Sequence, residues 1–388
     1  MRVVNPSKES QHDRPRSFGI LSSYPPTACG LATFTAALAS GLSKHNSEVN
    51  VVRVVDTGGQ IPPSDRVVGQ LVNGSSQSVN ASSDALNCSD IAIIQHEYGL
   101  YGGADGDEVL EILGALHVPS IVIAHTILTD PSPHQRAVLN EVAALADRIV
   151  VMTEAARSRL NTCFDVDERK VTTIAHGAAV PAAGATPDSL RHPTMLTWGL
   201  IGPGKGIERV IEAMRTLHDL PMQPHYLVAG QTHPKVLAAQ GEAYRRDRLA
   251  QAKRHGLSSS VEFDADYRDV ESLTTLIQSS TVVVLPYDSK DQVTSGVLVD
   301  AIAAGRPVVA TAFPHAVELL SSGAGLVVDH DDPDAMALAL RRVLTDTELA
   351  ANMAAEASRL APSLGWSMIA GEYLQLADRL MTERLSLV

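Results

Sequence analysis

The sequence has few cysteines and few aromatic residues. Only 3 of its 388 residues are Cys, and Phe, Trp and Tyr together make up 4%. Cys29, Cys88 and Cys163 are an odd number at wide spacing with no CxxC pair. The sequence therefore predicts neither a disulfide framework nor a cysteine-based zinc site. This cysteine usage fits a reducing compartment, and we expect a cytoplasmic protein.

Long apolar runs and positive charge are also scarce. The longest apolar stretches, such as 149–152 and 281–285, are far shorter than the roughly 18 residues that a membrane span requires. The chain has 31 Lys and Arg against 44 Asp and Glu, a formal net charge of −13, and an acidic surface repels a phosphate backbone. The sequence thus predicts no transmembrane helix and no nucleic-acid partner, and nothing in it supports peripheral membrane contact.

Short apolar runs alternate with helix-period segments, a pattern typical of parallel sheets with helices on both faces. In the first half the predicted strands are Phe18–Leu21, Val49–Val55, Ile91–Gln95, Ser120–Ala124, Arg148–Met152 and Val171–Ile174. The helices predicted there are Leu31–Leu42, Asp107–Ala115, Pro133–Ala146 and Glu154–Cys163. In the second half the predicted strands are Thr194–Leu200, His225–Ala229, Val261–Phe263, Thr281–Leu285, Pro307–Ala310 and Gly325–Val328. Its predicted helices are Gly206–Leu217, Pro234–His255, Val270–Ser279, Ser295–Ala304 and Asp334–Leu344.

These elements predict two doubly wound, Rossmann-like α/β domains. Residues 1–16 are polar, lack the apolar segment of a secretory signal, and are interpreted as a disordered lead-in. The first domain is expected over 17–180 and the second over 194–362, joined by a small-residue linker at 181–193. Ligands in such folds bind beyond the carboxyl ends of the strands. We therefore expect the functional residues in strand-to-helix turns that face a cleft between the domains.

The strongest local signal is a glycine-rich turn between a predicted strand and an amphipathic helix. Its sequence is Gly199-Leu200-Ile201-Gly202-Pro203-Gly204-Lys205-Gly206. Backbone N–H groups at such a turn, with Lys205 inside it, suit a di- or triphosphate. Gly202 belongs to the same predicted phosphate-binding turn.

Three other interpretations of this turn fit less well. Gly206 stands where a Walker A loop requires the Ser or Thr that binds Mg²⁺. The acidic ribose ligand of a dinucleotide fingerprint is missing, because the next strand ends in Val228-Ala229-Gly230-Gln231. A turn built only for packing explains the glycines but not the lysine.

A second signal lies about 90 residues further on. Thr294, Ser295 and Gly296 form a predicted helix start whose free N–H groups suit a phosphate, and Asp300 follows on the same helix. By itself a Ser-Gly pair before an apolar helix is usually only a cap.

Together the two segments resemble the retaining glycosyltransferases of the GT-B fold, specifically family GT4. The resemblance rests on the turn Gly199 to Gly206 and on the segment Asp300-Ala301-Ile302-Ala303-Ala304-Gly305-Arg306-Pro307-Val308-Val309. It covers essentially the whole chain. It implies a final helix, from Trp366 to Leu385 within 363–388, that crosses back onto the first domain.

The resemblance also implies roles for individual residues. Lys205 neutralises the donor diphosphate, while Leu200 stands where the family usually has an Arg. The family's E-x7-E signature falls on Gln292 and Asp300, as a sugar ligand and a ribose ligand. Gln292 is an amide and still bonds a hydroxyl, without charge assistance. Glu318 stands where the family often has a donor-site Glu.

The first half supplies matching segments. Gly30 lies in a loop that resembles the family's first glycine loop near the donor phosphate; a plain turn stays an alternative. The string Gln95-His96-Glu97-Tyr98-Gly99-Leu100-Tyr101-Gly102-Gly103 is too polar and glycine-rich for a core. We interpret its His96, Glu97 and Tyr98 as acceptor-facing.

Two further histidines end predicted strands. His125 would orient the sugar or the acceptor hydroxyl, and His176 would line the cleft on the acceptor side. A structural role is the alternative for each of them. His233, His255 and His330 fall on predicted polar surfaces, and no His-x-x-His metal spacing is present.

The resemblance thus implies a retaining transfer of a hexose, with mannose slightly favoured over glucose. The partners are a nucleotide-diphosphate sugar as donor and a sugar, lipid or small-molecule hydroxyl as acceptor. Lys205, His125 and Gln292 are the catalytic candidates, and no cofactor or metal is expected. Two alternatives stay open: a non-catalytic nucleotide-sugar-binding subunit, and a sugar-nucleotide epimerase on the same fold.

Overall fold

The computed structural model describes residues 16–59, 64–181, 192–266, 268–332 and 334–386. Most of the predicted lead-in and of the predicted linker lies outside the described residues. By its contacts the chain divides into two compact units. Unit 1 comprises the described residues of 1–123, 133–149 and 370–388, and unit 2 those of 124–132 and 150–369.

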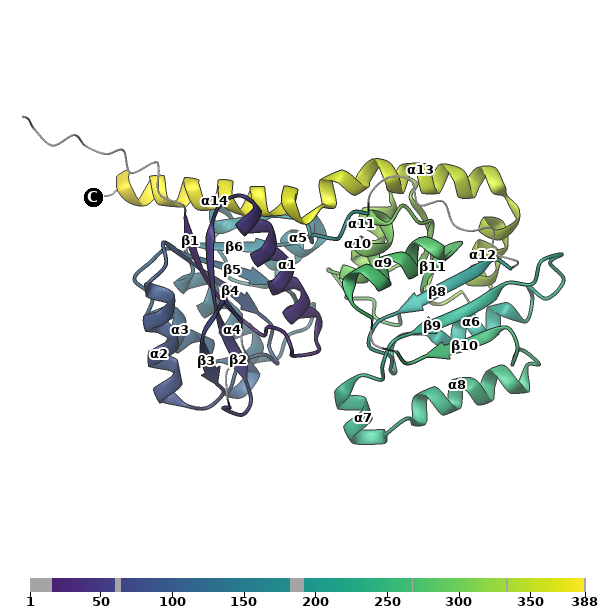
Figure 1. The fold of residues 1–388 in the computed structure, drawn as a ribbon, viewed down its shortest axis with the longest axis horizontal. Helices are drawn as coiled ribbons and strands as arrows, with labels where there is room; N and C mark the ends of the chain where they lie inside the picture. The colour runs from purple at the N-terminus through teal and green to yellow at the C-terminus, as the bar shows by residue number, and fades with distance from the viewer. Residues whose placement is uncertain (1–15, 60–63, 182–191, 267, 333, 387–388) are drawn as a thin grey trace, which may run out of the picture. The chain divides into compact units, whose positions relative to one another are not determined.

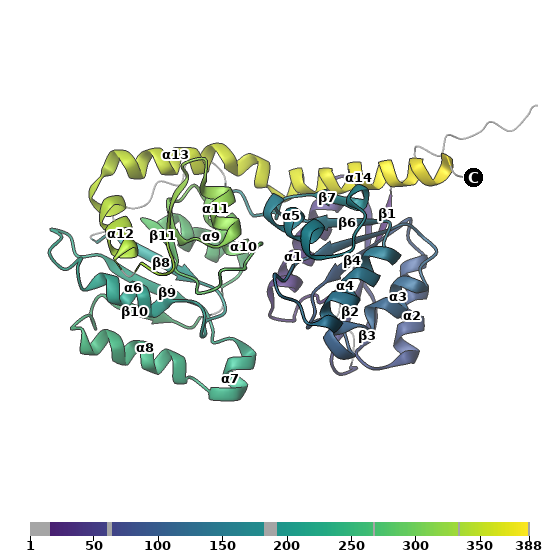
Figure 2. The ribbon, with the colours of Figure 1, turned by 180° about the vertical axis from the view of Figure 1, so that it is seen from behind.

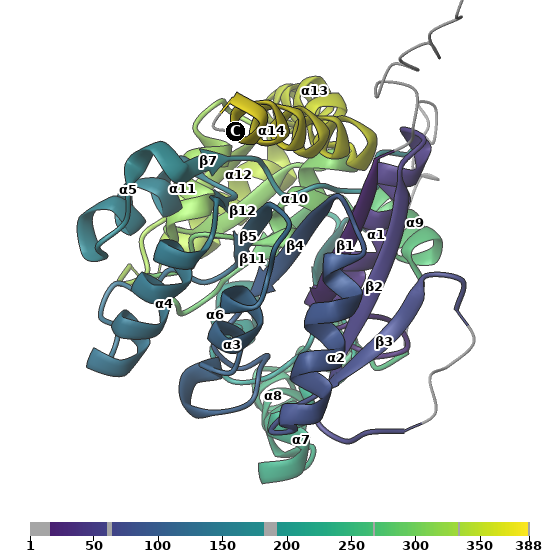
Figure 3. The ribbon, with the colours of Figure 1, turned by 90° about the vertical axis from the view of Figure 1, so that its left-hand side faces the viewer.

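The first sheet has seven strands. They are β1 (Ser17–Ser22), β2 (Glu48–Val55), β3 (Val67–Val72), β4 (Ile91–His96), β5 (Ser120–Ala124), β6 (Arg148–Val151) and β7 (Val171–Thr173). Their order is β3-β2-β1-β4-β5-β6-β7, with β1 parallel to β2 and β4 (Figure 3). Every residue of β1, β4 and β5 is buried, as expected for central strands covered on both faces.

Three helices of this part start at side-chain caps. The helices of this part are α1 (Gly30–Lys44), α2 (Ser76–Asn87), α3 (Val109–Gly114), α4 (Pro133–Leu145) and α5 (Glu154–Cys163), with 3-10 turns at Ala104–Gly106 and Glu168–Lys170. The Cys29 thiol accepts the Ala32 N–H at the start of α1, and Thr153 caps α5 through the Ala156 N–H. Gly19 lets α2 approach β1, because a Cβ there would lie 3.0 Å from the Ser89 Oγ.

The second sheet has six strands. They are β8 (Thr194–Trp198), β9 (His225–Ala229), β10 (Val261–Asp264), β11 (Val282–Leu285), β12 (Val308–Thr311) and β13 (Gly325–Val328). Their order is β10-β9-β8-β11-β12-β13, and the paired strands are parallel. Successive residues of β8 enter two different cores: Met195 packs with α6 residues such as Val210, and Leu196 packs with α10 residues such as Leu298.

Helices cover both faces of this sheet. They are α6 (Ile207–Met214), α7 (Pro234–Gln240), α8 (Ala243–Arg254), α9 (Val270–Ser279), α10 (Gly296–Ala303), α11 (Pro314–Leu320), α12 (Ala335–Thr345) and α13 (Thr347–Leu364). Helix α6 packs against both α8 and α12 (Figure 2). The expected pair of doubly wound α/β domains is confirmed.

Helix α14 (Trp366–Ser386) ends the described chain (Figure 1). From Ala370 onward its residues belong to unit 1. There Asp378 accepts a hydrogen bond from Arg16, and Glu383 pairs with Arg148. None of the described helices is long and apolar enough to cross a membrane.

Several features of the fold differ from expectation. The sequence did not predict the edge strand β3 or the Ser/Asn-rich helix α2, and it did not predict α11 or α13. The predicted single helix over Pro234–His255 is wrong, because the chain breaks it into α7 and α8 at Gly241, whose φ is 59°. That left-handed conformation suits glycine and ends a helix.

We predict opposite effects for two substitutions of Tyr373 in α14. The residue is fully buried, and its hydroxyl has no hydrogen-bond partner among the described residues. Tyr373→Phe removes only an unpaired polar atom, so the melting temperature should stay unchanged or rise. Tyr373→Ala leaves a cavity and should cost about 3–5 kcal/mol. Thermal and urea unfolding measure both; a large loss in the Phe variant would contradict the assignment.

Candidate functional site

Each sheet reverses its strand order at one point, and open α/β sheets bind ligands at such points. In the second sheet the reversal lies between β8 and β11, and in the first between β1 and β4. The four turns that follow these strands are therefore the places to examine. They contain most of the residues singled out by sequence.

In unit 2 the turns after β8 and β11 are locked together. Gly206, at the start of α6, has a φ of 66°, and a Cβ there would collide with the carbonyl oxygen of Pro286. The Asp288 N–H donates to the Gly204 carbonyl at 3.0 Å. The close approach requires glycine both for space and for conformation.

Lys205 lies at this junction. Its Nζ is 4.4 Å from the centroid of the Tyr287 ring, a cation–π contact. Tyr287 is buried and stacks on Phe313, with the ring centroids 5.4 Å apart. Within the described part of the chain, the Lys205 ammonium forms no hydrogen bond or ion pair. The side chain is thus held over an aromatic face while its charge stays unneutralised.

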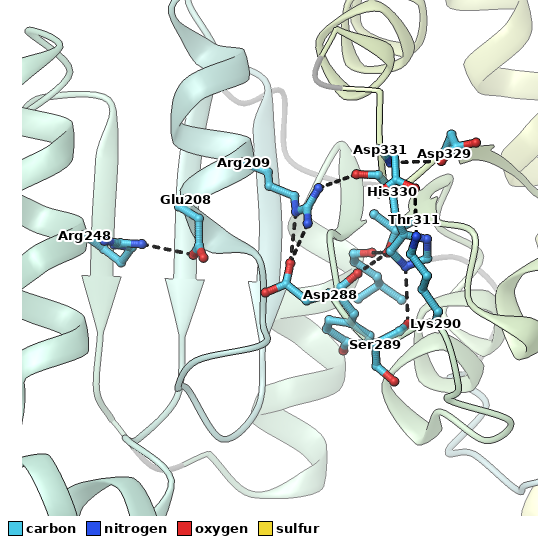
Figure 4. Close-up of polar contacts among 12 residues, drawn as sticks. Glu208, Arg209, Arg248, Asp288, Ser289, Lys290, Thr311, Asp329, His330 and Asp331 are labelled. Atoms are coloured by element: carbon cyan, nitrogen blue, oxygen red, sulfur yellow. Dashed lines mark hydrogen bonds and ion pairs between the residues drawn. The ribbon is translucent and has the colours of Figure 1, made fainter. Parts of the chain in front are cut away.

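A polar network also joins helix α6, the turn after β11 and the loop after β13 (Figure 4). The Arg209 guanidinium donates to Asp288 at 3.0 Å and to the His330 carbonyl at 2.6 Å. Lys290 pairs with Asp331 at 2.8 Å. The predicted exposed position of His330 is wrong, because only 6% of its surface is accessible. The His330 carbonyl accepts a hydrogen bond from Arg209, which connects the loop after β13 to α6.

The start of α10 is held by the buried His315 and the half-buried His176. The Ser295 side chain caps the Leu298 N–H, and the Ser295 N–H itself donates to the His315 Nδ1 at 2.8 Å. Burial lowers the pKa of His315 to about 3, so this ring is neutral and accepts the bond. Of the predicted phosphate-binding amides, that of Ser295 is therefore already engaged.

His176 lies against the same helix start. A Cβ on Gly296 would lie 2.9 Å from the His176 Nε2, so glycine admits the ring. The ring also contacts Trp366, with the ring centroids 5.7 Å apart. Burial lowers the pKa of His176 to about 4. His176 therefore lies next to Gly296, at the start of α10 in unit 2.

Gln292, Thr294 and Asp300 complete this region. The Gln292 amide donates to the Thr294 carbonyl at 3.1 Å, and the buried Thr294 hydroxyl has no partner among the described residues. Burial raises the pKa of Asp300 to about 7. Its carboxyl forms no hydrogen bond or ion pair with the residues that the structure describes.

In unit 1 strand β4 ends in a buried imidazole, that of His96. His96 is 1% exposed, and neither ring nitrogen has a partner among the described residues. Burial lowers its pKa to about 4, so the ring is neutral. Its centroid is 5.2 Å from that of Tyr98, whose buried hydroxyl is also unpartnered there. Burial and then Glu97 raise the pKa of Tyr98.

Residues 187–360 match the family model for glycosyl transferases group 1. Curated relatives include D-inositol 3-phosphate glycosyltransferases from Corynebacterium urealyticum (26% identity) and Corynebacterium glutamicum (25%). The alignments span 61% and 67% of this chain, and 58% and 66% of those relatives. A phosphatidyl-myo-inositol mannosyltransferase from Mycolicibacterium smegmatis is 38% identical over 21% of this chain and 22% of its own length.

Solved structures agree over nearly the whole chain. Sucrose-phosphate synthase from Thermosynechococcus elongatus superimposes with a TM-score of 0.73 at 18% identity, covering 95% of this chain and 100% of the other. The Anabaena protein HepE, in complex with UDP and glucose, gives 0.72 at 16% identity, with 96% and 100% covered. The chain has the GT-B fold of these structures. The group 1 match agrees with the expected family GT4.

Within this GT-B chain, the predicted site residues fall into two sets. Unit 2 contains those of the donor side and two of the histidines: His125, His176, Gly202, Lys205, Gln292, Thr294, Ser295, Gly296 and Asp300. Unit 1 contains Gly30, His96, Glu97 and Tyr98 at the reversal point of the first sheet. Among the described residues, no group of three or more His, Cys, Asp and Glu side chains is arranged to hold a metal.

Several contributors were missed from the sequence. Tyr287 and Asp288 follow β11, and their polar character at a strand end was a usable signal. No local signal marks His315 or Arg209, because their hydrogen-bond partners lie 20 and 121 residues away in the chain. Glu318 has a definite place: its two carboxylate oxygens accept the Glu154 and Ala155 N–H groups, both at 2.9 Å. It binds the start of α5, as a carboxylate at a helix N-terminus does.

We predict a pH-dependent stability effect of Asp300. The native carboxyl keeps its proton up to a pKa of about 7, whereas an unfolded Asp releases it near 4. The native state therefore binds more protons in this window, and the free energy of unfolding falls as pH rises from about 4 to 7. Asp300→Asn should remove this fall.

Urea unfolding at several pH values between 4.5 and 8 measures the effect. The exposed Asp84 provides the control variant Asp84→Asn. The gain of Asp300→Asn over the wild type should grow with pH up to about 7 and then stay constant. A gain that is independent of pH would refute the raised pKa.

Proposed function

We propose that this chain is a retaining glycosyltransferase that moves a hexose from a nucleotide-diphosphate sugar to a hydroxyl acceptor. The observation that carries the proposal is Lys205, an unneutralised ammonium held over Tyr287 at the reversal point of the second sheet. A cation fixed at this position suits a diphosphate whose charge grows as the sugar leaves. No metal is required if Lys205 supplies this charge.

The other residues of unit 2 fit supporting roles. The Gly202–Gly206 turn offers backbone N–H groups to the phosphates, together with Thr294 and Gly296. Gln292 keeps its Oε1 for a sugar hydroxyl, since its amide nitrogen already donates to Thr294. Asp300 is assigned to the ribose hydroxyls, His125 to the sugar or the acceptor hydroxyl, and His176 to the acceptor side. Gly30 in unit 1 is assigned to the phosphate side.

We assign the acceptor to unit 1. His96 has two unpartnered buried ring nitrogens, and the Tyr98 hydroxyl beside it is unpartnered as well. A neutral imidazole both donates and accepts, which suits a polyol or sugar hydroxyl. Buried polar groups normally have partners, so an acceptor is the expected occupant. Glu97 is the carboxylate of the same turn.

The relatives support the choice of substrates. The Anabaena structure holds UDP and glucose, and the Mycolicibacterium relative is named a mannosyltransferase. We favour mannose slightly over glucose as the transferred sugar and leave the base to experiment. A thermal-shift screen of UDP-, GDP- and ADP-sugars identifies it, because a ligand that binds the native state raises stability.

A second candidate is a non-catalytic nucleotide-sugar-binding subunit. Leu200 and Gln292 favour it, because each lacks a charge that the family usually has at that position. Radiolabelled donor separates the two candidates: an enzyme hydrolyses or transfers the sugar, whereas a scaffold only binds it.

We predict that Lys205→Ala lowers kcat/KM by about 10²-fold or more, as the loss of a preorganised cation at a developing charge does. Steady-state assays of nucleotide release measure this. Lys253→Ala, at an exposed position on α8, is the matched control and should keep wild-type activity. Wild-type turnover in the Lys205 variant would remove the phosphate assignment. The same assay in excess EDTA tests whether a metal is needed.

The stereochemistry provides an independent test. A double displacement needs a carboxylate beside the anomeric carbon, but Gln292 is an amide and Asp300 is assigned to the ribose. We therefore expect same-face transfer, in which the departing diphosphate oxygen takes the acceptor's proton. An α-linked donor should give an α-linked product, read from the anomeric coupling by NMR. A β-linked product would mean inversion and would make Glu97 the first candidate for a general base.

A further inference from the structure

One row of polar side chains in unit 1 has no place in the function proposed so far. Ser22 is the last residue of β1 and pairs in register with Arg53 of β2, which pairs in turn with Gln70 of β3. Figure 3 shows these three strands side by side. Register partners in a parallel sheet lie on the same face, on strands about 4.8 Å apart. The three side chains therefore form a row across the sheet, one on each strand.

The row lies on the face of the sheet opposite α2. A Cβ at Gly19 would meet Ser89 and Leu86 of the α2 region, and Ser22, three residues further along β1, points the other way. Helix α1 packs on β1 and β2. Because Ser22 directly precedes the turn after β1, the row adjoins the reversal point of the first sheet.

The polar atoms of this row lack partners. The Ser22 hydroxyl, the Arg53 Nε and Nη1, and the Gln70 Nε2 are buried without a hydrogen bond to any described residue. Gln70 is oriented by the Gly59 N–H, which donates to its Oε1 at 3.5 Å and leaves the NH₂ group as the free end. Arg53 is partly buried and forms no ion pair within the described ranges.

All these free groups are able to donate. A guanidinium, an amide NH₂ and a hydroxyl together match an oxyanion, and Arg binds carboxylates and phosphates through its planar fork. Burying unpaired donors, and above all an unpaired charge, is unfavourable without a ligand. The nearest acidic neighbour in sequence, Asp56, accepts a hydrogen bond from Asn73 instead.

We infer that Arg53, Ser22 and Gln70 bind an anionic oxygen group, a phosphate or a carboxylate, on the acceptor. The inference rests on the proposed function, in that it places the acceptor in unit 1. It adds that the acceptor is an acidic sugar or polyol rather than a neutral one, and that a site separate from His96 and Tyr98 selects its charge.

Binding by the full-length chain tests this without any turnover. The probes are mannose 6-phosphate, glucuronate and neutral mannose, titrated by calorimetry. The wild type should bind one of the two anions at least about tenfold more tightly than mannose, since hydrogen bonds to a charged group contribute this much or more. The phosphate and carboxylate probes show which anion the row prefers.

Three variants locate the effect. Arg53→Gln should abolish the preference for the anion, and Ser22→Ala should reduce it several-fold while leaving the arginine in place. Arg169→Gln makes the same chemical change at an exposed position whose guanidinium pairs with Asp167, and should bind like the wild type. Because Arg53 lacks a partner, Arg53→Gln should not lower the melting temperature. The measured melting temperature also shows whether this variant is folded.

The outcomes separate this inference from the proposed function. Equal binding of charged and neutral probes by the wild type, or an anion preference that survives in Arg53→Gln, would overturn the assignment of the row. A nucleotide-sugar assay is run in parallel on the same protein. An anion preference that depends on Arg53, together with no donor turnover, would overturn the transferase proposal and leave the row as an anion site.

Discussion

The arrangement of unit 2 depends on one close approach, where the backbone of Gly206 passes the carbonyl of Pro286 with no room for a side chain. This contact joins the turn after β8 to the turn after β11 and sets the height of Lys205 above the Tyr287 ring. Arg209 and Asp288 brace the same junction through an ion pair. The position of Lys205 thus follows from backbone packing rather than from a partner of opposite charge.

Two histidines that carry no charge contact the start of α10. His315 accepts the Ser295 N–H and His176 lies against Gly296, and burial keeps both rings neutral. Neutral rings add no positive charge that would compete with Lys205 for an anion. The two histidines therefore fix the start of α10, whereas Lys205 supplies the positive charge of this region.

Sequence periodicity predicted the central strands because they are buried on both faces and hence continuously apolar, as in β4 and β5. It failed at β3, an edge strand that contains Gly69 and Gln70 and is only partly buried. It failed at α2, whose Ser and Asn residues are weak helix formers. The glycine turn was predictable since its signal is local. Arg209 and His315 were not, because their hydrogen bonds join residues 121 and 20 positions apart in the chain.

Glu318 shows that hydrogen bonds join α5, which directly follows strand β6 of the first sheet, to the second half of the chain. This residue of α11 caps α5, and the Thr153 hydroxyl before α5 donates to the Val293 carbonyl at 2.9 Å. A fragment cut at the predicted linker would leave the first turn of α5 without its carboxylate and Val293 without its donor. Expressing the two Rossmann-like halves separately would therefore sever a shared hydrogen-bonded seam.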